Sequence, residues 1–308
     1  MLSQGDRNIA INQTTFAKDL TYQADTSVGQ IFKDLKEIAE IKQLAEQKVA
    51  YLRTLAVGSW LGIVLIIIIG LSLGFFNGLT TFIGLGFVIL AVLLLPVLIV
   101  AAILCYFKWN YYHKLKLRDD RYELSKKIVS MVNRDLTPNR NVKIMIHFTH
   151  GGEKGKKIQT LSHPRNRGWI NIFEDQWLIL EGNFLDSTNF LLTVTELNRT
   201  TYKRKAGGKL KSTKNKPKGT EINLKLSFPS KKYGAIHVIQ KAAPEAVKLP
   251  EEVNLKKMKV TPKAIDLTVH TPHFFNPEEM YQTITMMFLS LYQVLNFAKL
   301  LSKRQTLS

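Results

Sequence analysis

The chain has 308 residues, a formal net charge of +19 at pH 7 and a hydrophobic content of 45%. That length leaves room for a membrane anchor and one soluble domain of ordinary size. The single cysteine, Cys105, excludes a disulfide within the chain and a zinc site built from several cysteines, which is typical of proteins in a reducing cytoplasm.

Residues 1–26 are polar, with scattered Asn, Gln, Thr and Asp and no sustained apolar period. We predict a disordered or loosely attached N-terminus there. The first residues do not combine a basic segment with an apolar core, so we expect no cleavable signal peptide. Residues 5–11, Gly-Asp-Arg-Asn-Ile-Ala-Ile, resemble a short segment that precedes modules in bacterial conflict-system proteins, and this resemblance implies no function by itself.

Residues 27–54 change to a helical pattern. Their apolar side chains recur at spacings of three and four, with Lys and Glu between them, which predicts a cytoplasmic stalk helix. No proline separates this segment from Leu55, so we expect the helix to continue into the next segment. The apolar positions are Ile31, Leu35, Ile38, Ala45, Val49 and Leu52.

Residues 55–107 contain no charged side chain and predict a transmembrane hairpin. Two apolar runs, 55–76 and 82–107, are separated by a short polar turn, and each meets the roughly 20 residues that a helix needs to cross about 30 Å of hydrocarbon. Peptide groups cannot be left unpaired in lipid, so both runs must be helical.

Basic residues flank this hairpin on both sides but are missing from its turn. The positive-inside bias therefore places both termini in the cytoplasm. We expect a two-span integral membrane protein of a bacterial inner membrane, with the lipid bilayer as its first partner. The flanking basic residues are Lys48, Arg53, Lys108, Lys114, Lys116, Arg118 and Arg121.

Five glycines form one stripe along the first apolar run. Small residues let helix backbones approach closely, so the stripe predicts packing either against the second helix of the same hairpin or between subunits of a homo-oligomer. No ionisable side chain lies in the membrane segment, which argues against a proton relay or an ion-coupled transporter. The stripe consists of Gly58, Gly62, Gly70, Gly74 and Gly78.

Residues 108–136 return to an amphipathic helical pattern, and Pro138 marks its end. This second stalk helix and the first one have similar lengths, about 40 Å at 1.5 Å per residue. Two helices of equal length beside a tight hairpin predict an antiparallel coiled-coil stalk.

Between residues 137 and 275 the apolar period falls to two, which predicts a basic, antiparallel β-domain and an α+β protein overall. Seven or eight short strands without an intervening helix indicate either a sandwich or an open barrel. Turns are expected at Glu174-Asp175 and Gly182-Asn183. The predicted strands are 142–148, 168–174, 177–182, 190–200, 222–228, 235–240 and 265–269.

Residues 276–304 predict a C-terminal amphipathic helix. Asn276 is a suitable N-cap, Pro277 follows at the first helical position, and two glutamates occupy the first turn. The apolar face is wide, but the polar residues within it argue against a third membrane crossing. We expect this helix to pack back along the stalk as a third helix of a bundle. Its C-terminal cations would then reach the lipid headgroups: Lys299, Lys303 and Arg304.

Residues 203–218 hold eight cations and no anion. Because the run connects two predicted strands, we expect a mobile basic finger that binds anionic lipid headgroups or an acidic protein. Nucleic-acid phosphates are less favoured, since no recognition helix or stacking motif accompanies the run; a solvated loop without a ligand is the plain alternative. The cations are Lys203, Arg204, Lys205, Lys209, Lys211, Lys214, Lys216 and Lys218.

An aromatic cluster and two histidine pairs each have a functional and a simpler structural interpretation. Trp169, Phe173 and Trp177 have the arrangement of a stacking platform for single-stranded nucleic acid, but aromatic residues at strand spacing usually fill a core. Two His-x-x-His pairs would bring four imidazoles together if their strands were neighbours, but residues three apart point to opposite faces of a strand. We expect no metal and no cofactor. The pairs are His147 with His150 and His270 with His273.

The search for enzyme motifs is negative: we find no phosphate-binding loop, no nucleophile elbow and no paired acidic motif. We therefore expect a non-enzymatic, membrane-anchored binding or scaffold protein that presents a basic cytoplasmic β-domain to anionic lipid or to an acidic partner protein. The alternative is an oligomeric two-helix effector or pore that the β-domain gates. In layout the chain is similar to the two-helix membrane effectors of bacterial defence systems.

Overall fold

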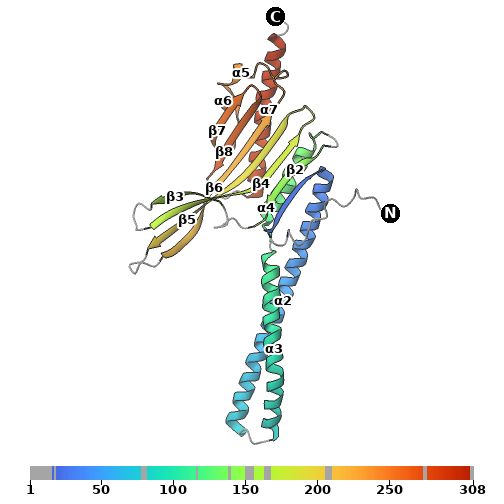
Figure 1. Cartoon of the computed structure of the whole chain (residues 1–308), viewed down its shortest axis with the longest axis vertical. Helices are drawn as coiled ribbons and strands as arrows, with labels where there is room; N and C mark the ends of the chain where they lie inside the picture. Colours follow the sequence, from blue (N-terminus) through green and yellow to red (C-terminus); the bar gives the residue numbers. More distant parts are fainter. Residues whose placement is uncertain are drawn as a thin grey trace, which may run out of the picture. The chain divides into compact units, whose positions relative to one another are not determined.

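The computed structural model contains a long helix near the N-terminus and an antiparallel sheet of eight strands, which is a mixed α+β class (Figure 1). The chain divides into two compact units: residues 1–35 with 117–308, and residues 36–116. We call these unit 1 and unit 2. The structure describes residues 16, 19–77, 82–115, 117–137, 140–149, 156–162, 168–204, 210–272 and 276–305.

Unit 1 is built on a single sheet. Its strands pair in the order β1-β2-β4-β5-β6-β8-β7, all antiparallel, and β3 pairs with the first half of β4. The strands are β1 (Thr21–Thr26), β2 (Val142–His147), β3 (Lys156–Ser162), β4 (Gly168–Asn183), β5 (Asn189–Arg204), β6 (Leu210–Ser227), β7 (Asn254–Thr261) and β8 (Ala264–Thr271).

The expected sandwich or barrel is therefore wrong. In the part of the chain that the structure describes, β1 and β7 are the two free ends of one open sheet. The strands were expected to be short, but β4, β5 and β6 have 16, 16 and 18 residues. No turn occurs at Glu174-Asp175, because β4 absorbs the irregularity as a bulge between Gln176 and Leu178 and continues.

Two local predictions also need correction. Residues 21–26, expected to lack regular structure, form the edge strand β1, whose register pairs Tyr22 with Ile146 and Ala24 with Ile144. The strand expected at 235–240 is instead the short helix α5 (Ile236–Ile239), followed by α6 (Ala243–Ala246). Alternating apolar residues there fit one helical turn as well as a strand, an ambiguity that short runs always carry.

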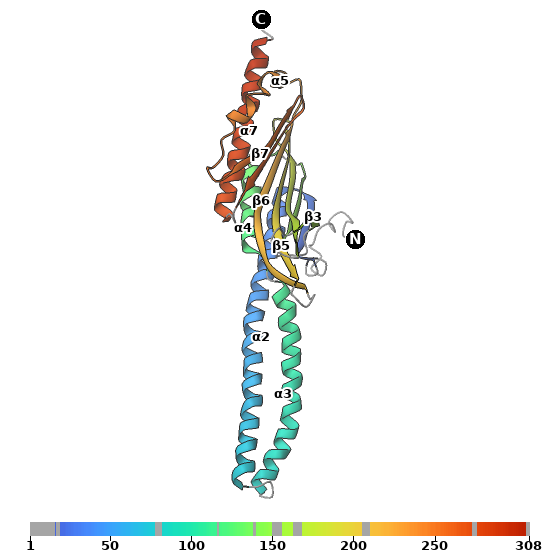
Figure 2. The ribbon, with the colours of Figure 1, turned by 90° about the vertical axis from the view of Figure 1, so that its left-hand side faces the viewer.

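Helices α4 (Asp119–Asn133) and α7 (Pro277–Gln305) cover one face of the sheet (Figure 2). The alternating strand residues that face them are buried, as the pattern along β8 shows, where Ile265, Leu267 and Val269 have 0% exposure. From α7, Ile284 and Leu291 are equally buried. Each such side chain contributes about 1.5–3 kcal/mol by leaving water, so the sheet and these helices form one hydrophobic core.

The N-cap of α7 is the one predicted from the sequence, whereas the packing of the whole helix differs in part from the prediction. Asn276 Oδ1 accepts a hydrogen bond from the backbone N–H of Glu279 at 2.9 Å, and Asn276 Nδ2 donates to the Glu279 carboxylate at 3.1 Å. The helix, however, packs on the sheet and on α4, where Thr285 Oγ1 donates to Met131 Sδ at 3.2 Å. Because α4 lies within the predicted stalk segment 108–136, the expected contact of the C-terminal helix with that segment is present. The prediction did not include the sheet, which the apolar face of α7 also covers.

The helix before the hairpin turn agrees with the prediction, whereas the helical segment after it is interrupted. Helix α2 (Val28–Asn77) is continuous through 50 residues, as expected. Helix α3 (Phe82–Lys114) ends before Leu115, and α4 begins only at Asp119, so a single helix over 108–136 is wrong. Leu117 is 3% exposed and Arg118 donates its backbone N–H to Phe148 O at 3.4 Å, so these two residues before α4 are fixed in unit 1. A coiled-coil stalk stays a prediction.

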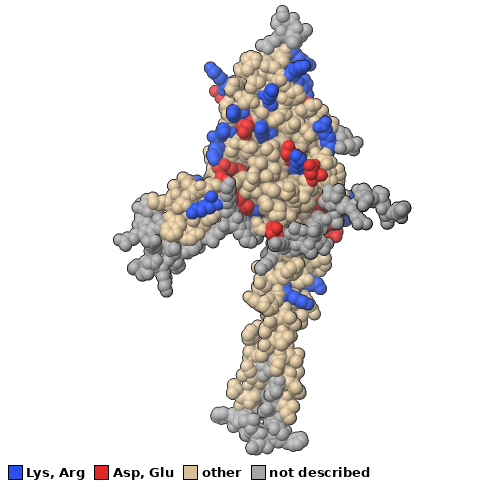
Figure 3. Space-filling view, in the orientation of Figure 1, with Lys and Arg blue, Asp and Glu red and all other residues tan. Residues whose placement is uncertain are grey.

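Unit 2 holds most of α2 and all of α3. Many of its large apolar side chains are exposed, among them Leu61 at 64%, Leu71 at 71% and Leu93 at 64%. In Figure 3 the described residues of the lower part of this hairpin are tan, and none of them is a blue or red charged residue. By length and composition, two helices among the described residues are able to cross a membrane: Val28–Ser72, whose most apolar window is 0% buried, and Pro277–Lys303, whose window is 44% buried as in a core helix.

Candidate functional site

Three features of unit 1 combine polar chemistry with defined geometry: a buried charge cluster, a basic extension of the sheet, and an apolar groove. The first lies where α4 meets the middle of the long strands. Asp175 on β4 stands directly opposite Glu196 on β5 in the sheet register. Two carboxylates in such positions repel each other unless cations neutralise them.

Helix α4 supplies those cations. Arg121 Nη2 donates to Asp175 Oδ2 at 2.6 Å and to Glu196 Oε2 at 2.8 Å, and Arg118 Nη1 donates to the same Glu196 oxygen at 2.8 Å. Arg121 is 1% exposed, and its guanidinium carbon lies 5.2 Å from the ring centroid of Trp177. A buried ion pair of this kind adds little net stability over apolar packing, but removing one partner costs about 3–5 kcal/mol.

The same cluster changes proton affinities nearby. Burial alone would raise the pKa of Asp120, but hydrogen bonding and charge from Arg118 outweigh it and lower that pKa. Burial lowers the pKa of His147 below its usual value, the positive charge of Arg121 acts in the same direction, and Asp175 opposes both. His147 Nδ1 lies 2.8 Å from Thr21 Oγ1, which links this end of β2 to β1.

A second buried carboxylate fixes the start of α2 within unit 1. Asp34 is 1% exposed, and it accepts hydrogen bonds from the Tyr22 hydroxyl at 2.7 Å and from Gln30 Nε2 at 2.7 Å. Burial and the bond to Asp34 raise the pKa of Tyr22 far above its usual value. The segments through which the chain leaves and re-enters unit 1 thus both carry a buried, hydrogen-bonded charged residue.

The second feature is the basic extension, which we call the β-arm: β3 with residues 168–173 of β4, 197–204 of β5 and 210–219 of β6. These strand ends project beyond the strands that α7 covers (Figures 1 and 2). At the base of the β-arm Gly219 has φ +133°, and a Cβ there would lie 2.2 Å from Thr271 O. Only glycine fits this position without strain.

The β-arm has no acidic side chain to balance its cations. Neither residues 154–173 nor residues 197–220 contain Asp or Glu. Arg199 stands directly opposite Lys216 in the register, and both are exposed. Like charges in opposed positions raise the free energy of the isolated protein and favour binding of an anion between them. Beside them a hollow of about 420 Å³ is lined by Leu161, Ile170, Ile172, Arg199 and Lys218, among others.

The structure changes the prediction for the basic run. It is not a loop throughout: Lys203 and Arg204 end β5, and Lys211 to Lys218 belong to β6, with Lys203 opposite Lys211. Lys205 and Lys209 lie outside the described residues. The sequence predicted a loop because the run connects two predicted strands, and its residues do not alternate with apolar ones as those of a half-buried strand do.

Two of the three aromatic residues lie in the core, and only one histidine of each pair lies among the described residues. Trp177 and Phe173 are buried, at 1% and 7% exposure, and Trp169 stacks on Tyr202 with 5.5 Å between ring centroids. His147 on β2 and His270 on β8 are separated by three strands, so the condition under which the four imidazoles would come together is not met by these two residues. His150 and His273 lie outside the described residues. Among the residues that the structure does describe, no group of three His, Cys, Asp or Glu is placed to hold a metal ion.

The glycine stripe is placed only in part. A Cβ on Gly62 would lie 3.7 Å from Leu98 Cδ1, so this glycine faces α3, whereas a Cβ on Gly58 would have no described atom within 4 Å. Gly70 and Gly74 lie on α2, and Gly78 lies outside the described residues. Packing between subunits stays a prediction.

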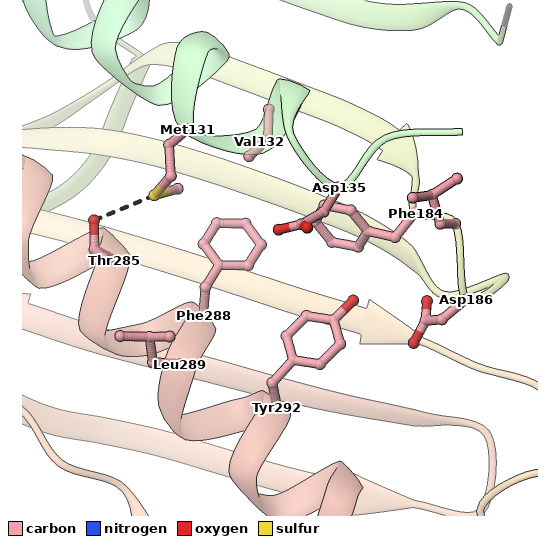
Figure 4. Close-up of a pocket in the computed structure, with 10 residues that line it drawn as sticks. Met131, Val132, Asp135, Phe184, Asp186, Thr285, Phe288, Leu289 and Tyr292 are labelled. Atoms are coloured by element: carbon pink, nitrogen blue, oxygen red, sulfur yellow. Dashed lines mark hydrogen bonds between the residues drawn. The ribbon is translucent and has the colours of Figure 1, made fainter. Parts of the chain in front are cut away.

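The third feature is a groove between the end of α4, the β4–β5 turn and the middle of α7 (Figure 4). It has a volume of about 360 Å³. Its floor is aromatic: the ring centroids of Phe184 and Phe288 are 6.0 Å apart, and those of Phe184 and Tyr292 are 5.8 Å apart. Leu185 and Leu289 stand at its edge and are each 62% exposed. Two carboxylates, Asp135 and Asp186, also line it.

The sequence analysis missed the charge cluster and the groove. A signal for the cluster was present, since Arg121 interrupts the apolar seam formed by Leu117, Leu124 and Ile128, as Asp34 does between Ile31 and Ile38. A charged residue on an apolar helix face is buried only when it is paired. Nothing in the sequence marked the groove, because its three walls come from distant segments.

Comparisons with protein-family models, with curated proteins and with solved structures found no match. The fold therefore defines the class: a mixed α+β protein with a long N-terminal helix and an eight-stranded antiparallel sheet.

Proposed function

We propose that this protein is a membrane-anchored, non-enzymatic binding protein that holds an anionic surface through its β-arm. The observation that carries the proposal is the β-arm itself, an extension of the sheet on which cations accumulate without any acidic residue. Anionic lipid headgroups of the cytoplasmic leaflet are the preferred ligand, and an acidic partner protein has the same chemistry.

The anchor is the hairpin of residues 55–107. Its charge-free sequence and its exposed apolar side chains support insertion into lipid, where the exposed surface would otherwise favour aggregation. In the proposed topology both termini and unit 1 lie in the cytoplasm, since the flanking basic residues lie on both outer sides of the hairpin.

The number of cations determines how strongly the β-arm is attracted to an anionic surface. A Lys or Arg close to an anionic leaflet contributes about 1 kcal/mol, and the contribution falls off within a Debye length of about 10 Å at 0.1 M salt. Several cations on paired strands act together and lose less conformational freedom than cations on a loop. The attraction should therefore be strong at low salt and weak at high salt.

A site-specific fluorophore tests the proposal. Ile158, an exposed residue of the β-arm, is changed to Cys in a Cys105→Ser background, and the full chain is labelled and reconstituted in nanodiscs. With about 30% anionic lipid we expect a shift of the emission that neutral lipid does not cause and that 1 M salt reverses.

A matched pair of variants identifies the surface. The first replaces Lys211, Lys214, Lys216 and Lys218 of the β-arm by Gln and should lose the shift. The control replaces Lys231, Lys241, Lys248 and Lys263, all exposed and outside the β-arm, and should keep it. Equal behaviour of the two variants would refute binding through the β-arm. A response to soluble polyglutamate but not to anionic lipid would identify an acidic protein as the ligand, and dye leakage from liposomes would favour the pore instead.

A further inference from the structure

We infer that the groove between α4, the β4–β5 turn and α7 binds a small organic cation with an apolar body, such as an aromatic or alkyl ammonium ion. This site is separate from the β-arm, and the inference does not depend on the proposed function.

The groove has the size and the lining of a small-molecule site. A volume of about 360 Å³ lies within the range of small-molecule sites, which are apolar hollows with a few polar groups that fix the ligand. Phe184 and Phe288 are 4% and 7% exposed, so the aromatic floor is fixed by packing and does not have to form when a ligand enters. The exposed Leu185 and Leu289 offer apolar contacts at the rim.

The charge of the lining determines which ligand fits. In a chain of net charge +19, the charged residues that line this groove are two aspartates. In Figure 4 the Asp135 carboxylate points over the groove toward the Phe288 ring, and the Tyr292 hydroxyl points toward the β4–β5 turn. Carboxylates beside aromatic ring faces are the surroundings that ammonium groups prefer.

The two aspartates have different roles. Asp186 is held in place: its carboxylate accepts hydrogen bonds from Thr188 N at 2.9 Å and from the Tyr233 hydroxyl at 3.0 Å, and Lys232 Nζ lies 3.8 Å away. Burial alone would raise its pKa, but these bonds and the Lys232 charge lower it, so it stays ionised. Asp135 is exposed and has no ion-pair partner among the described residues, so its charge is available for a ligand.

A partner helix is a poorer occupant. Helix-in-groove binding uses several apolar anchors along the groove, whereas only Leu185 and Leu289 are exposed large apolar residues among those that line this one. We therefore assign the groove to a small cation.

Three probes of similar size test the assignment on the full chain in detergent: benzyltrimethylammonium, benzyl alcohol and 3-phenylpropionate. Saturation-transfer NMR or calorimetry should show the cation binding about fivefold more tightly than the other two, since one partly exposed ion pair contributes up to about 1 kcal/mol. Equal affinity for the three probes, or binding of none, would overturn the assignment.

Variants locate the site. Asp135→Asn should weaken binding of the cation about fivefold, and Leu289→Lys, which places a cation at the rim, should abolish it. Both residues are exposed, so neither change disturbs the core. Glu251→Gln, an exposed residue away from the groove, makes the same charge change as Asp135→Asn and should leave affinity unaltered. Unchanged binding by Leu289→Lys would place the probe elsewhere and refute the site.

Discussion

Arg121 on α4 donates a hydrogen bond to Glu196 on β5, with 2.8 Å between the nitrogen and the oxygen. The bond joins the first helix after the hairpin to the strand from which the β-arm extends. Arg121 lies four residues after Leu117, where unit 1 resumes, and Glu196 lies three residues before Arg199, the first cation of β5. Together with the bonds from Arg118 to Glu196 and from Arg121 to Asp175, this contact connects the base of the β-arm to α4, the helix that follows the hairpin.

Arg121→Met should lower the free energy of unfolding of unit 1 by about 3–5 kcal/mol, because Asp175 would lose its ion-pair partner opposite Glu196, which would keep Arg118 alone. Thermal unfolding of the full chain in detergent measures this loss. Lys126→Met, a change of an exposed cation on the same helix, is the control and should have little effect. Equal melting temperatures for the two variants would contradict the importance of the cluster.

Gly219→Ala should destabilise the base of the β-arm, since the added Cβ meets Thr271 O at 2.2 Å and the backbone has φ +133°. A loss of more than about 1 kcal/mol is expected for such strain. Gly234→Ala is the matched control, because its Cβ would meet nothing nearer than 3.8 Å. Hydrogen exchange along β5 and β6 should rise in the first variant only; unchanged exchange would show that the β-arm does not depend on this glycine.

Tyr22→Phe should loosen β1 from the start of α2. The change removes the donor at 2.7 Å from Asp34 and leaves that buried carboxylate with Gln30 alone, at a cost of about 1–3 kcal/mol. We expect faster amide exchange in β1 and an earlier thermal transition. Thr26→Val, a half-buried residue at the other end of the same strand, serves as the comparison. If both variants exchange alike, the bond between Tyr22 and Asp34 does not hold the strand.

Stability should fall as the pH decreases through the titration of His147. Its pKa is lowered in the folded protein, so the unfolded chain binds a proton first as the pH falls below about 6.5. The contribution is therefore complete above pH 6.5 and is lost as the pH approaches the lower, folded value. His147→Gln should reduce the difference in melting temperature between pH 7.5 and pH 5.5, whereas His237→Gln, an exposed control, should not. An unaltered difference in the first variant would assign the pH dependence to other groups.

The sequence predicted the elements that depend on local pattern and missed those that depend on long-range packing. The cap at Asn276 and the strands that contain Ile144, Leu224 and Leu267 follow from residue type and period alone. The placement of α7 could not be read in this way, because an apolar stripe does not say which of two apolar faces will cover it. Likewise β1 is polar in sequence and becomes a strand because Tyr22 and Ala24 pair with β2.

For the basic site, the sequence predicted which residues are involved but not the structure that they form. The basic run drew attention to residues 203–218, but whether they form a loop or paired strands depends on β4 and β8, which support β5 and β6 from both sides. The groove and the Arg121 cluster combine residues more than fifty positions apart, so no local motif could mark them.

Accessibility of single cysteines tests the membrane anchor most directly. In a Cys105→Ser background, cysteines at Lys48, Leu79, Lys108 and Glu251 are labelled by an impermeant thiol reagent in intact cells and then in opened membranes. The account predicts labelling at position 79 in intact cells, and at the other three positions only after the membranes are opened. Labelling of positions 48 and 108 from opposite sides, or of all four positions in the soluble fraction, would contradict a two-span hairpin with unit 1 in the cytoplasm.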